Sequence, residues 1–285
     1  MAITSVTLVD APREMVLMPR DGLKLQGLNA PFPAAREVVE QRTDDDGERD
    51  TTELFGATSC SIELLATQTG ASFKDELGRF LHPRSRPYLV VSDDEWAQER
   101  RLLLRSDQFA APLTVDLPPA MRRMQAQWKV PDGVWEAVDL VSETVNADAA
   151  ASGGAAYPRT YPYSYAATTS AGASTLSNQG GTPAHIVARL YGPCTGPSLI
   201  NETLGEEITF TDGLVLGSGE YVEVNTQDRS AYLNSSTSLS RLNYLDFEVS
   251  AWWLLDPGDQ QVRYAPSLVS GAAAAVITYR PAWIT

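Results

Sequence analysis

Residues 124–135 read MQAQWKVPDGVW, and this stretch decides the fold class because its polarity alternates and then breaks at a turn. Period-two alternation is typical of a β-strand with one buried face. A proline, an aspartate and a glycine follow, which are residues that tight turns favour. The apolar positions that would share the buried face are Met124, Ala126, Trp128 and Val130.

The same alternation recurs on both sides of this stretch, so the sequence predicts a mainly β protein. In the second half the strands are short and are separated by turn signals such as Asp256–Asp259. Regularly spaced short strands of this kind predict an antiparallel β-sandwich. Further predicted strands lie at Cys60–Leu64, Leu113–Leu117, Ile186–Leu190, Ile208–Phe210, Val222–Val224 and Ala273–Tyr279.

One helix is expected among the strands of the first half. Phe73, Leu77 and Phe80 recur at helical spacing, and Pro83 stops the helix just beyond them. Ser72, followed three residues later by an aspartate, resembles a capping box at the start.

An acidic stretch, Asp44–Glu48, precedes this helix in the sequence. Its carboxylates could suggest a calcium site, but the position of the glycine does not fit an EF-hand loop. We therefore predict a solvated turn between two strands.

A segment of small and polar residues divides the chain. Of residues 146–183, 28 are Ala, Gly, Ser, Thr or Pro, so the segment has little apolar surface to bury. We predict an N-terminal domain over 1–145, a connector over 146–183 and a C-terminal domain over 184–285. The alternating Tyr161, Tyr163 and Tyr165 allow two interpretations: a linker lying on its own domains, or an arm that docks on a neighbouring subunit.

Composition excludes several classes of protein. The net charge of −14 over 285 residues disfavours a protein that grips DNA or RNA, because phosphate would be repelled. With only two cysteines and two histidines, a four-ligand zinc site of Cys and His is not expected without a partner chain, and a disulfide framework is excluded, although a single Cys60–Cys194 bridge stays an open alternative. The start of the chain lacks the pattern of a signal peptide, and no apolar run is long enough to span a bilayer.

Catalytic motifs are absent from the sequence. It contains no nucleophile elbow, P-loop, zinc-protease helix or dinucleotide fingerprint. His82 is interpreted as a cap at a helix end, His185 as a surface residue, and Cys60 as a small core residue. We therefore expect no catalytic residue, no metal and no cofactor; a cell-wall hydrolase is the least favoured interpretation.

Trp252 and Trp253 are adjacent, so on a strand they would face opposite sides. The outward ring could anchor a subunit contact or stack on a sugar, while the inward ring would belong to the core.

Several short sequence motifs follow one another in a fixed order over about 105 residues of the second half. They are Asn178–Thr182, Pro197–Asn201, Gly219–Thr226, Pro257–Gly258 and Tyr279–Trp283. In this order they resemble the C-terminal region of bacteriophage distal tail proteins. The first half is similar more loosely, through the helix that ends before His82 and through the stretch around Trp128–Trp135.

The resemblance implies a structural protein of the tail tip of a siphophage virion. Its fold would be a tail-tube-like N-terminal β-domain with one helix, followed by a galectin-like antiparallel β-sandwich. Such proteins form a six-fold ring that joins the tail tube to the tip hub, and DNA passes through it without specific contacts. Expected partners are further copies, the tail tube protein, the hub protein and other minor tail proteins; synthesis would occur in the host cytoplasm, without membrane insertion.

The negative charge agrees with a ring whose lining does not hold phosphate. Ring closure requires two different patches on each subunit, and Met124–Val130 or the Tyr161–Tyr165 arm could contribute to them. The alternative function is a carbohydrate-binding module for adsorption to the host surface, with Trp252 or Trp253 in its site.

Overall fold

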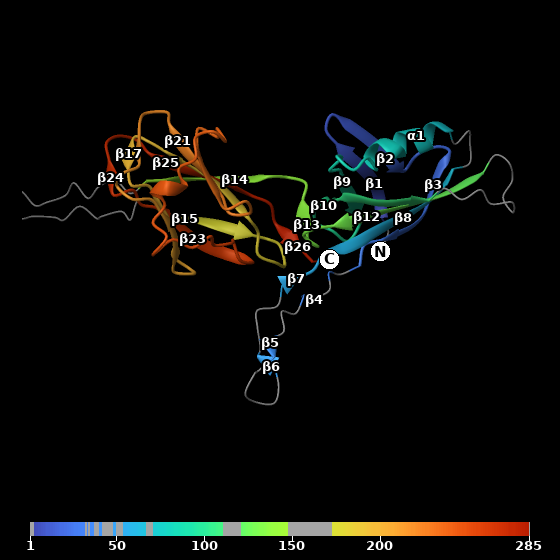
Figure 1. Cartoon of the computed structure of the whole chain (residues 1–285), viewed down its shortest axis with the longest axis horizontal. Helices are drawn as coiled ribbons and strands as arrows, with labels where there is room; N and C mark the ends of the chain where they lie inside the picture. The colour runs from blue at the N-terminus through green and yellow to red at the C-terminus, as the bar shows by residue number, and fades with distance from the viewer. Residues whose placement is uncertain are drawn as a thin grey trace, which may run out of the picture. The chain divides into compact units, whose positions relative to one another are not determined.

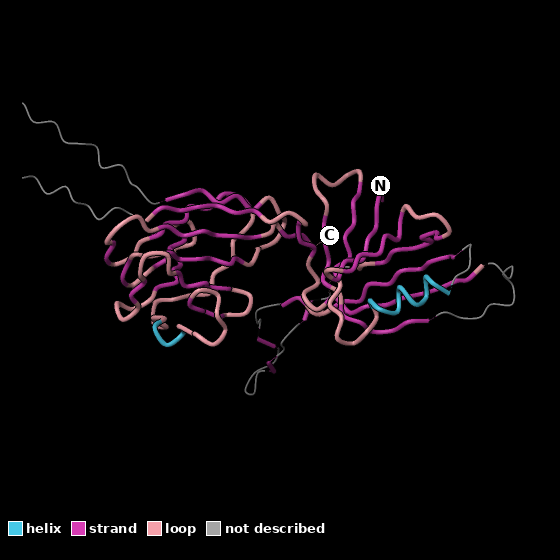
Figure 2. The backbone as a smooth tube through the Cα atoms, turned by 90° about the horizontal axis from the view of Figure 1, so that it is seen from above, coloured by secondary structure: helices cyan, strands magenta, loops and turns pink. Residues whose placement is uncertain are grey.

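The computed structural model describes residues 3–31, 33, 35–36, 40–41, 48–49, 54–66, 71–110, 121–147 and 173–284. The chain divides into two compact units (Figure 1), residues 1–139 with 283–285, and residues 140–282. The prediction of a mainly β protein is confirmed (Figure 2), and the one α-helix in the described residues lies in the first unit.

The first unit contains two main sheets. The six-stranded sheet has the order β2 (Arg13–Met18), β1 (Ile3–Asp10), β9 (Tyr88–Asp93), β10 (Arg100–Leu103), β13 (Trp135–Ala137) and β26 (Ala282–Trp283). The four-stranded sheet has the order β11 (Arg105–Ala110), β12 (Arg122–Val130), β8 (Thr58–Ala66) and β3 (Leu23–Asn29). Two short ribbons pair β4 (Ala35–Arg36) with β7 (Leu54–Phe55) and β5 (Glu40–Gln41) with β6 (Glu48–Arg49).

The core of the first unit forms where alternation predicts it. In β12 and β8 every second side chain is at most 2% exposed. The two strands pair over nine residues, so their apolar faces form one continuous surface. The residues on it are Cys60, Ile62, Leu64, Ala66, Met124, Ala126, Trp128 and Val130.

Helix α1 spans Ala71–Phe80 and ends shortly before Pro83, as its sequence predicts. Leu77 and Phe80 are buried in the core of the first unit. On its other side Glu76 forms an ion pair with Arg20 at 2.9 Å. The side chain of Ser72 lies outside the described residues, so the capping box stays a prediction.

Replacing Gly78 in α1 by alanine should stabilise the first unit by roughly 0.5–1 kcal/mol, because glycine is a poor helix former. An added Cβ meets no atom within 4 Å there. The matched control is Gly205→Ala, where space is equally open but φ is +71°, so strain should destabilise the protein. Urea unfolding of the three proteins measures both effects; an unchanged or lower midpoint for Gly78→Ala would contradict the expectation.

The second unit is built from three antiparallel sheets. The five-stranded sheet has the order β14 (Val141–Asn146), β25 (Ala274–Tyr279), β16 (Ile186–Tyr191), β21 (Tyr221–Asn225) and β22 (Ser230–Leu233). The four-stranded sheet has the order β15 (Ala173–Asn178), β23 (Gly258–Tyr264), β18 (Ser198–Asn201) and β19 (Glu206–Thr209). A small sheet joins β20 (Val215–Leu216), β17 (Cys194–Thr195) and β24 (Leu268–Val269), and η1 is a single 3₁₀ turn, Leu242–Tyr244.

Both larger sheets of this unit bury alternate side chains. Ile186, Ala188 and Leu190 of β16 are fully buried, as are Val262 and Tyr264 of β23. Two sheets that each bury one face are typical of a sandwich with a shared core.

The boundary of the second unit differs in two places from the expected positions. β14 lies within 1–145 except for its last residue, Asn146, but all six of its residues pair with β25, so the strand belongs to the second unit. β15 lies within the expected connector and pairs along its whole length with β23. Outside the described residues lie Tyr161, Tyr163 and Tyr165, the strand at Leu113–Leu117 and residues 42–47 of the acidic stretch.

Candidate interaction surfaces

The adjacent tryptophans differ in exposure. Trp253 is 2% exposed, and its indole Nε1 has no hydrogen-bond partner. Trp252 is half-buried. The stretch 251–254 is not a strand, so the expected alternation of a strand does not position them. The ring of Trp253 is therefore not accessible to a sugar or a subunit, and only Trp252 retains an exposed part.

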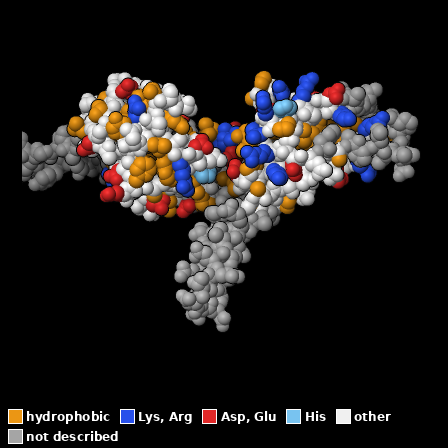
Figure 3. Space-filling model, in the orientation of Figure 1, with side chains coloured by type: hydrophobic (Ala, Val, Ile, Leu, Met, Phe, Trp, Pro, Cys, Tyr) orange, Lys and Arg blue, Asp and Glu red, His pale blue; other side chains and the backbone are white. Residues whose placement is uncertain are grey.

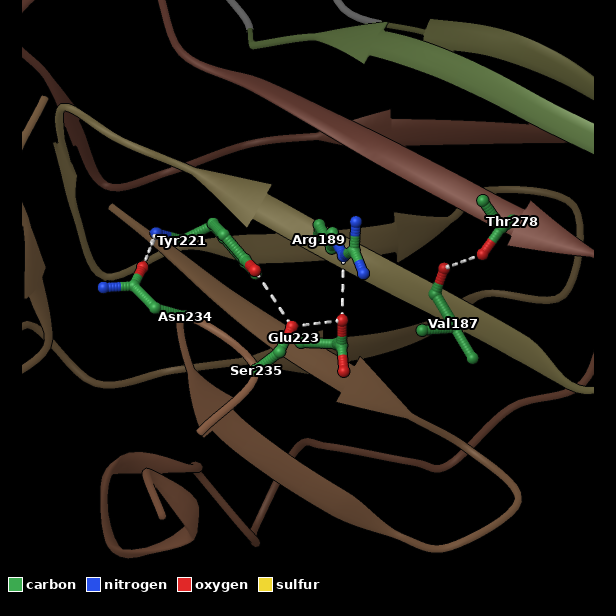
Figure 4. A network of polar contacts seen from close by, with 7 residues as sticks. All are labelled: Val187, Arg189, Tyr221, Glu223, Asn234, Ser235 and Thr278. Carbon is green, nitrogen blue, oxygen red and sulfur yellow. Dashed lines mark hydrogen bonds and ion pairs between the residues drawn. The ribbon is translucent and has the colours of Figure 1, made fainter. Parts of the chain in front are cut away.

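The outer face of the five-stranded sheet carries a connected polar network (Figure 4). Arg189 of β16 and Glu223 of β21 lie directly opposite each other in the register, and the Arg189 Nε–Glu223 Oε2 distance is 2.8 Å. The hydroxyl of Ser235 donates to the same Glu223 oxygen at 2.6 Å and lies 2.9 Å from the hydroxyl of Tyr221. Asn234 fixes the turn by accepting the backbone N–H of Tyr221.

Two tyrosines extend this network along the sheet. Tyr191 and Tyr221 are also opposite each other, with ring centroids 4.9 Å apart and planes tilted by 42°. The guanidinium of Arg189 lies 5.4 Å from the centre of the Tyr221 ring. The face thus presents an aromatic pair beside a bonded pair of charges.

The contacts of Glu223 shift both ionisable partners. Burial alone would raise the pKa of Glu223, but the hydrogen bonds from Ser235 and Arg189 outweigh it and lower the pKa. The hydrogen bond to Glu223 raises the pKa of Arg189. Both shifts favour the charged forms, so the pair stays ionised at neutral pH.

A double-mutant cycle of Arg189→Ala and Glu223→Ala should give a coupling free energy of roughly 0.2–1 kcal/mol at neutral pH, the range for partly exposed pairs. Since the folded pKa of Glu223 is lowered, its contribution is present above the ordinary value of 4.5 and is lost as pH falls through the folded pKa. Urea unfolding at several pH values measures this. A coupling that is zero at pH 7, or that grows on acidification, would contradict it.

In the first unit, the open face of the four-stranded sheet carries basic side chains at both ends. Arg105 of β11 lies directly opposite Lys129 of β12, and both are exposed. Arg123 and Lys24 occupy the other end. Like charges placed opposite each other, as in the Arg105–Lys129 pair, reduce the stability of a sheet.

Because four exposed basic side chains lie on this face, the excess of acidic residues in the chain is not located there.

The cysteines are free and buried. Cys60 is 0% exposed, and burial raises its pKa to about 12. Cys194 is 3% exposed, and its Sγ lies 3.2 Å from the hydroxyl of Tyr264. Burial raises the pKa of Cys194 as well. Neither thiol has the accessible, electropositive surroundings of a reactive cysteine.

The described ranges, 3–31, 33, 35–36, 40–41, 48–49, 54–66, 71–110, 121–147 and 173–284, show neither a metal cluster nor a membrane-spanning helix. Within them, no group of three or more His, Cys, Asp or Glu side chains is arranged to hold a metal ion. No helix of this part of the chain combines the length and the apolar character needed to cross a membrane.

The first of the ordered sequence motifs, Asn178–Thr182, makes a turn in which Asn178 and Thr182 are buried. The amide of Asn178 donates to the carbonyl oxygens of Thr182 at 3.0 Å and Leu255 at 2.8 Å. Its Oδ1 accepts the backbone N–H of Gly180 at 2.9 Å. Thr182 and Gly181 both donate to the carbonyl of Ala282 near the end of the chain. This motif is therefore structural.

The second unit, with its antiparallel sheets and its ordered sequence motifs, is similar to a domain of phage tail components. Residues 179–283 match the family model described as "Siphovirus-type tail component, C-terminal domain". The C-terminal unit carries this domain, and the resemblance to phage distal tail proteins is confirmed. No curated protein matches the chain.

Solved structures extend the similarity of fold to the whole chain. The Dit protein of phage SPP1, described as a paradigm of the hub adsorption apparatus in phages that infect Gram-positive bacteria, aligns with a TM-score of 0.63. The alignment covers 97% of this chain and 98% of that one at 11% identity. A chain from the activated baseplate of phage P2 aligns with a TM-score of 0.50 and 12% identity, covering 97% and 98% of the two chains.

Proposed function

We propose that this protein is a structural component of a phage tail tip, in which six copies form a ring that joins the tail tube to the tip hub. The match of residues 179–283 to a tail-component domain carries this proposal. The fold shared with the Dit protein of phage SPP1 over nearly both full chains supports it. The proposed partners are further copies, the tail tube protein, the hub protein and other minor tail proteins; the protein would be synthesised in the host cytoplasm and located at the tail tip of the virion.

Transit of DNA through the ring is part of the same proposal. The net charge of −14 favours a particle that does not retain phosphate. Because Lys24, Arg105, Arg123 and Lys129 share the open face of the four-stranded sheet, an acidic lining would have to come from other residues.

The two edges of the four-stranded sheet supply the different patches that a closed ring requires. β3 is one edge and β11 the other, so each has backbone groups that no strand of its own sheet pairs. β12, with Met124–Val130, lies inside the sheet and is paired on both sides, so its backbone is not available as an edge. We propose that β3 of one copy lies beside β11 of the next.

Cross-linking tests the ring and its contact together. Gln26 of β3 and Gln108 of β11 are exposed, so Gln26→Cys and Gln108→Cys place thiols on opposite edges. A short bis-maleimide should give the double variant a ladder of covalent oligomers that stops at six. The native thiols are buried, so the unmodified protein serves as the unreactive control.

Each single cysteine variant is the matched control, since a contact between unlike edges cannot link two identical positions. Ladders from the single variants, or a double variant that stays monomeric while electron micrographs show rings, would overturn the proposed contact. Electron micrographs of virions that place the protein away from the tail tip would overturn the proposed function.

A second candidate function, carbohydrate binding at the host surface, is favoured by one observation. Tyr191 and Tyr221 form an aromatic pair beside Arg189 and Glu223 on an open sheet face, and such combinations suit sugars. A glycan array would show specific binding that Tyr221→Ala abolishes and Trp252→Ala does not. No binding by the wild-type protein at millimolar sugar would reject this candidate.

A further inference from the structure

A cavity of about 580 Å³ opens on the first unit between the β1–β2 turn and the end of α1. Arg13 follows the turn, Arg79 lies in the last turn of α1, and His82 and Arg84 follow the helix. Figure 3 shows Lys and Arg side chains gathered beside a histidine on this unit. Two short segments from different parts of the sequence therefore bring four basic side chains to one hollow.

Three arginines and two carboxylates line this cavity, so its arginines outnumber its acidic side chains. Within the described residues, no ion pair joins Arg13, Arg79 or Arg84 to a carboxylate. The two acidic lining residues are Asp10, which accepts a hydrogen bond from the 7% exposed Ser85, and Asp75. Arg79 alone could be explained as a cation at a helix C-terminus, but the other two arginines come from outside the helix.

His82 adds a hydrogen-bond donor to the cavity. His82 Nδ1 accepts the backbone N–H of Arg84 at 3.2 Å. When the imidazole is neutral, its proton must therefore be on Nε2, which makes that atom a hydrogen-bond donor. The guanidinium groups of the three arginines are donors only, so together with His82 Nε2 they can donate several hydrogen bonds to an anionic ligand.

The sequence contains one segment whose charge is complementary to the cavity. Asp44, Asp45, Asp46 and Glu48 place four carboxylates within five residues. β5 precedes this stretch and β6 begins at its last residue, Glu48; among the described residues the two strands pair with each other alone, as a two-stranded ribbon. Four like charges at such spacing repel one another, so a basic partner would relieve that repulsion.

We propose that the cavity formed by Arg13, Arg79, His82 and Arg84 binds the acidic segment Asp44–Glu48 of a neighbouring copy. The inference rests on the proposed ring, because a ring contact joins two different patches of the same chain. An acidic segment on one copy and a basic cavity on the next are such patches. The contact should weaken as salt screens it.

A peptide with the sequence of residues 40–49, EQRTDDDGER, tests the cavity without requiring a ring. In calorimetric titrations at low salt, it should bind the full chain at least tenfold more tightly than a peptide carrying amides in place of its Asp44, Asp45, Asp46 and Glu48 carboxylates. The double variant Arg79→Gln with Arg84→Gln should lose at least tenfold in affinity. The matched control is Arg105→Gln, an exposed arginine of the same unit outside the cavity, which should bind like the wild type.

Several outcomes would overturn the inference. Equal affinity for the two peptides, or an equal loss with Arg105→Gln, would show that the cavity does not recognise the segment. Competition by inorganic phosphate or duplex DNA at the peptide's own concentration would show a general anion site. A salt-dependent change in the stability of the monomer on Arg79→Gln, independent of protein concentration, would show a contact within one copy.

The ring itself is measured separately. If the cross-linking ladder of Gln26→Cys with Gln108→Cys reaches six while the peptide does not bind, the inference fails and the proposed function stands. If the peptide binds through Arg79 and Arg84 but no ladder or ring forms, recognition of the segment stands and the ring fails.

Discussion

Gly180→Ala should destabilise the second unit by about 3 kcal/mol or more, because there is no room for a side chain at this position. A Cβ at Gly180 would lie 2.2 Å from the carbonyl oxygen of Ala282 and 2.4 Å from its nitrogen. Both are backbone atoms, and the oxygen also accepts hydrogen bonds from the N–H groups of Gly181 and Thr182, so Ala282 cannot move without breaking the turn. Urea unfolding monitored by tryptophan fluorescence measures the loss.

The matched control for this substitution is Gly27→Ala in β3, where the nearest atom to an added Cβ is Glu63 Cβ at 3.9 Å. That variant should unfold within about 1 kcal/mol of the wild type, since the contact is ordinary. A Gly180→Ala protein as stable as Gly27→Ala would show that the turn can open without cost.

Trp128→Ala should destabilise the first unit by roughly 3–5 kcal/mol, the range for removing a large buried ring from a core. Trp128 is 0% exposed, and it lies at the centre of the apolar face shared by β12 and β8. Its loss leaves a cavity that the paired strands cannot close, because each is held by backbone hydrogen bonds on both sides. Differential scanning calorimetry of the full chain would show the lower transition.

Trp128→Phe separates packing from polarity at the same position. The indole Nε1 is buried without a hydrogen-bond partner, so removing it relieves an uncompensated polar group while most of the ring volume stays. The phenylalanine variant should therefore lose much less stability than the alanine variant. Equal losses would show that the shape of the indole, and not its volume, determines the stability of this core.

Alternation along the chain predicted the strands well, because one buried face dictates polarity at every second residue. Met124–Val130 and Ile186–Leu190 are strands with the expected inward residues. The same rule did not apply to Trp252 and Trp253, since it assumes a strand and the backbone there is irregular. The abundance of small and polar residues predicted a connector at Ala173–Asn178, where the structure has a strand. Only its pairing with β23, which is distant in the sequence, makes this segment a strand.

The candidate surfaces were less predictable than the strands. Arg189 and Glu223 lie 34 residues apart, and only the register of β16 against β21 brings them together. Arg13 and Arg79 meet at one cavity for a similar reason, because the β1–β2 turn and the end of α1 border the same hollow. Each of these charged residues is of a type that is common on any protein surface. A single sequence therefore does not indicate that Arg189 contacts Glu223 or that Arg13 and Arg79 line one cavity.

Trp283 of β26 completes the core of the first unit but is synthesised after the whole second unit. Trp283 packs against the core of the first unit, and the guanidinium of Arg100 lies 4.2 Å from the centre of its ring. A ribosome makes the rest of that unit by residue 139 and must then translate the entire second unit before this tryptophan emerges. The first unit is consequently incomplete until the second unit has been translated, and a nonsense codon ahead of position 283 would impair both units.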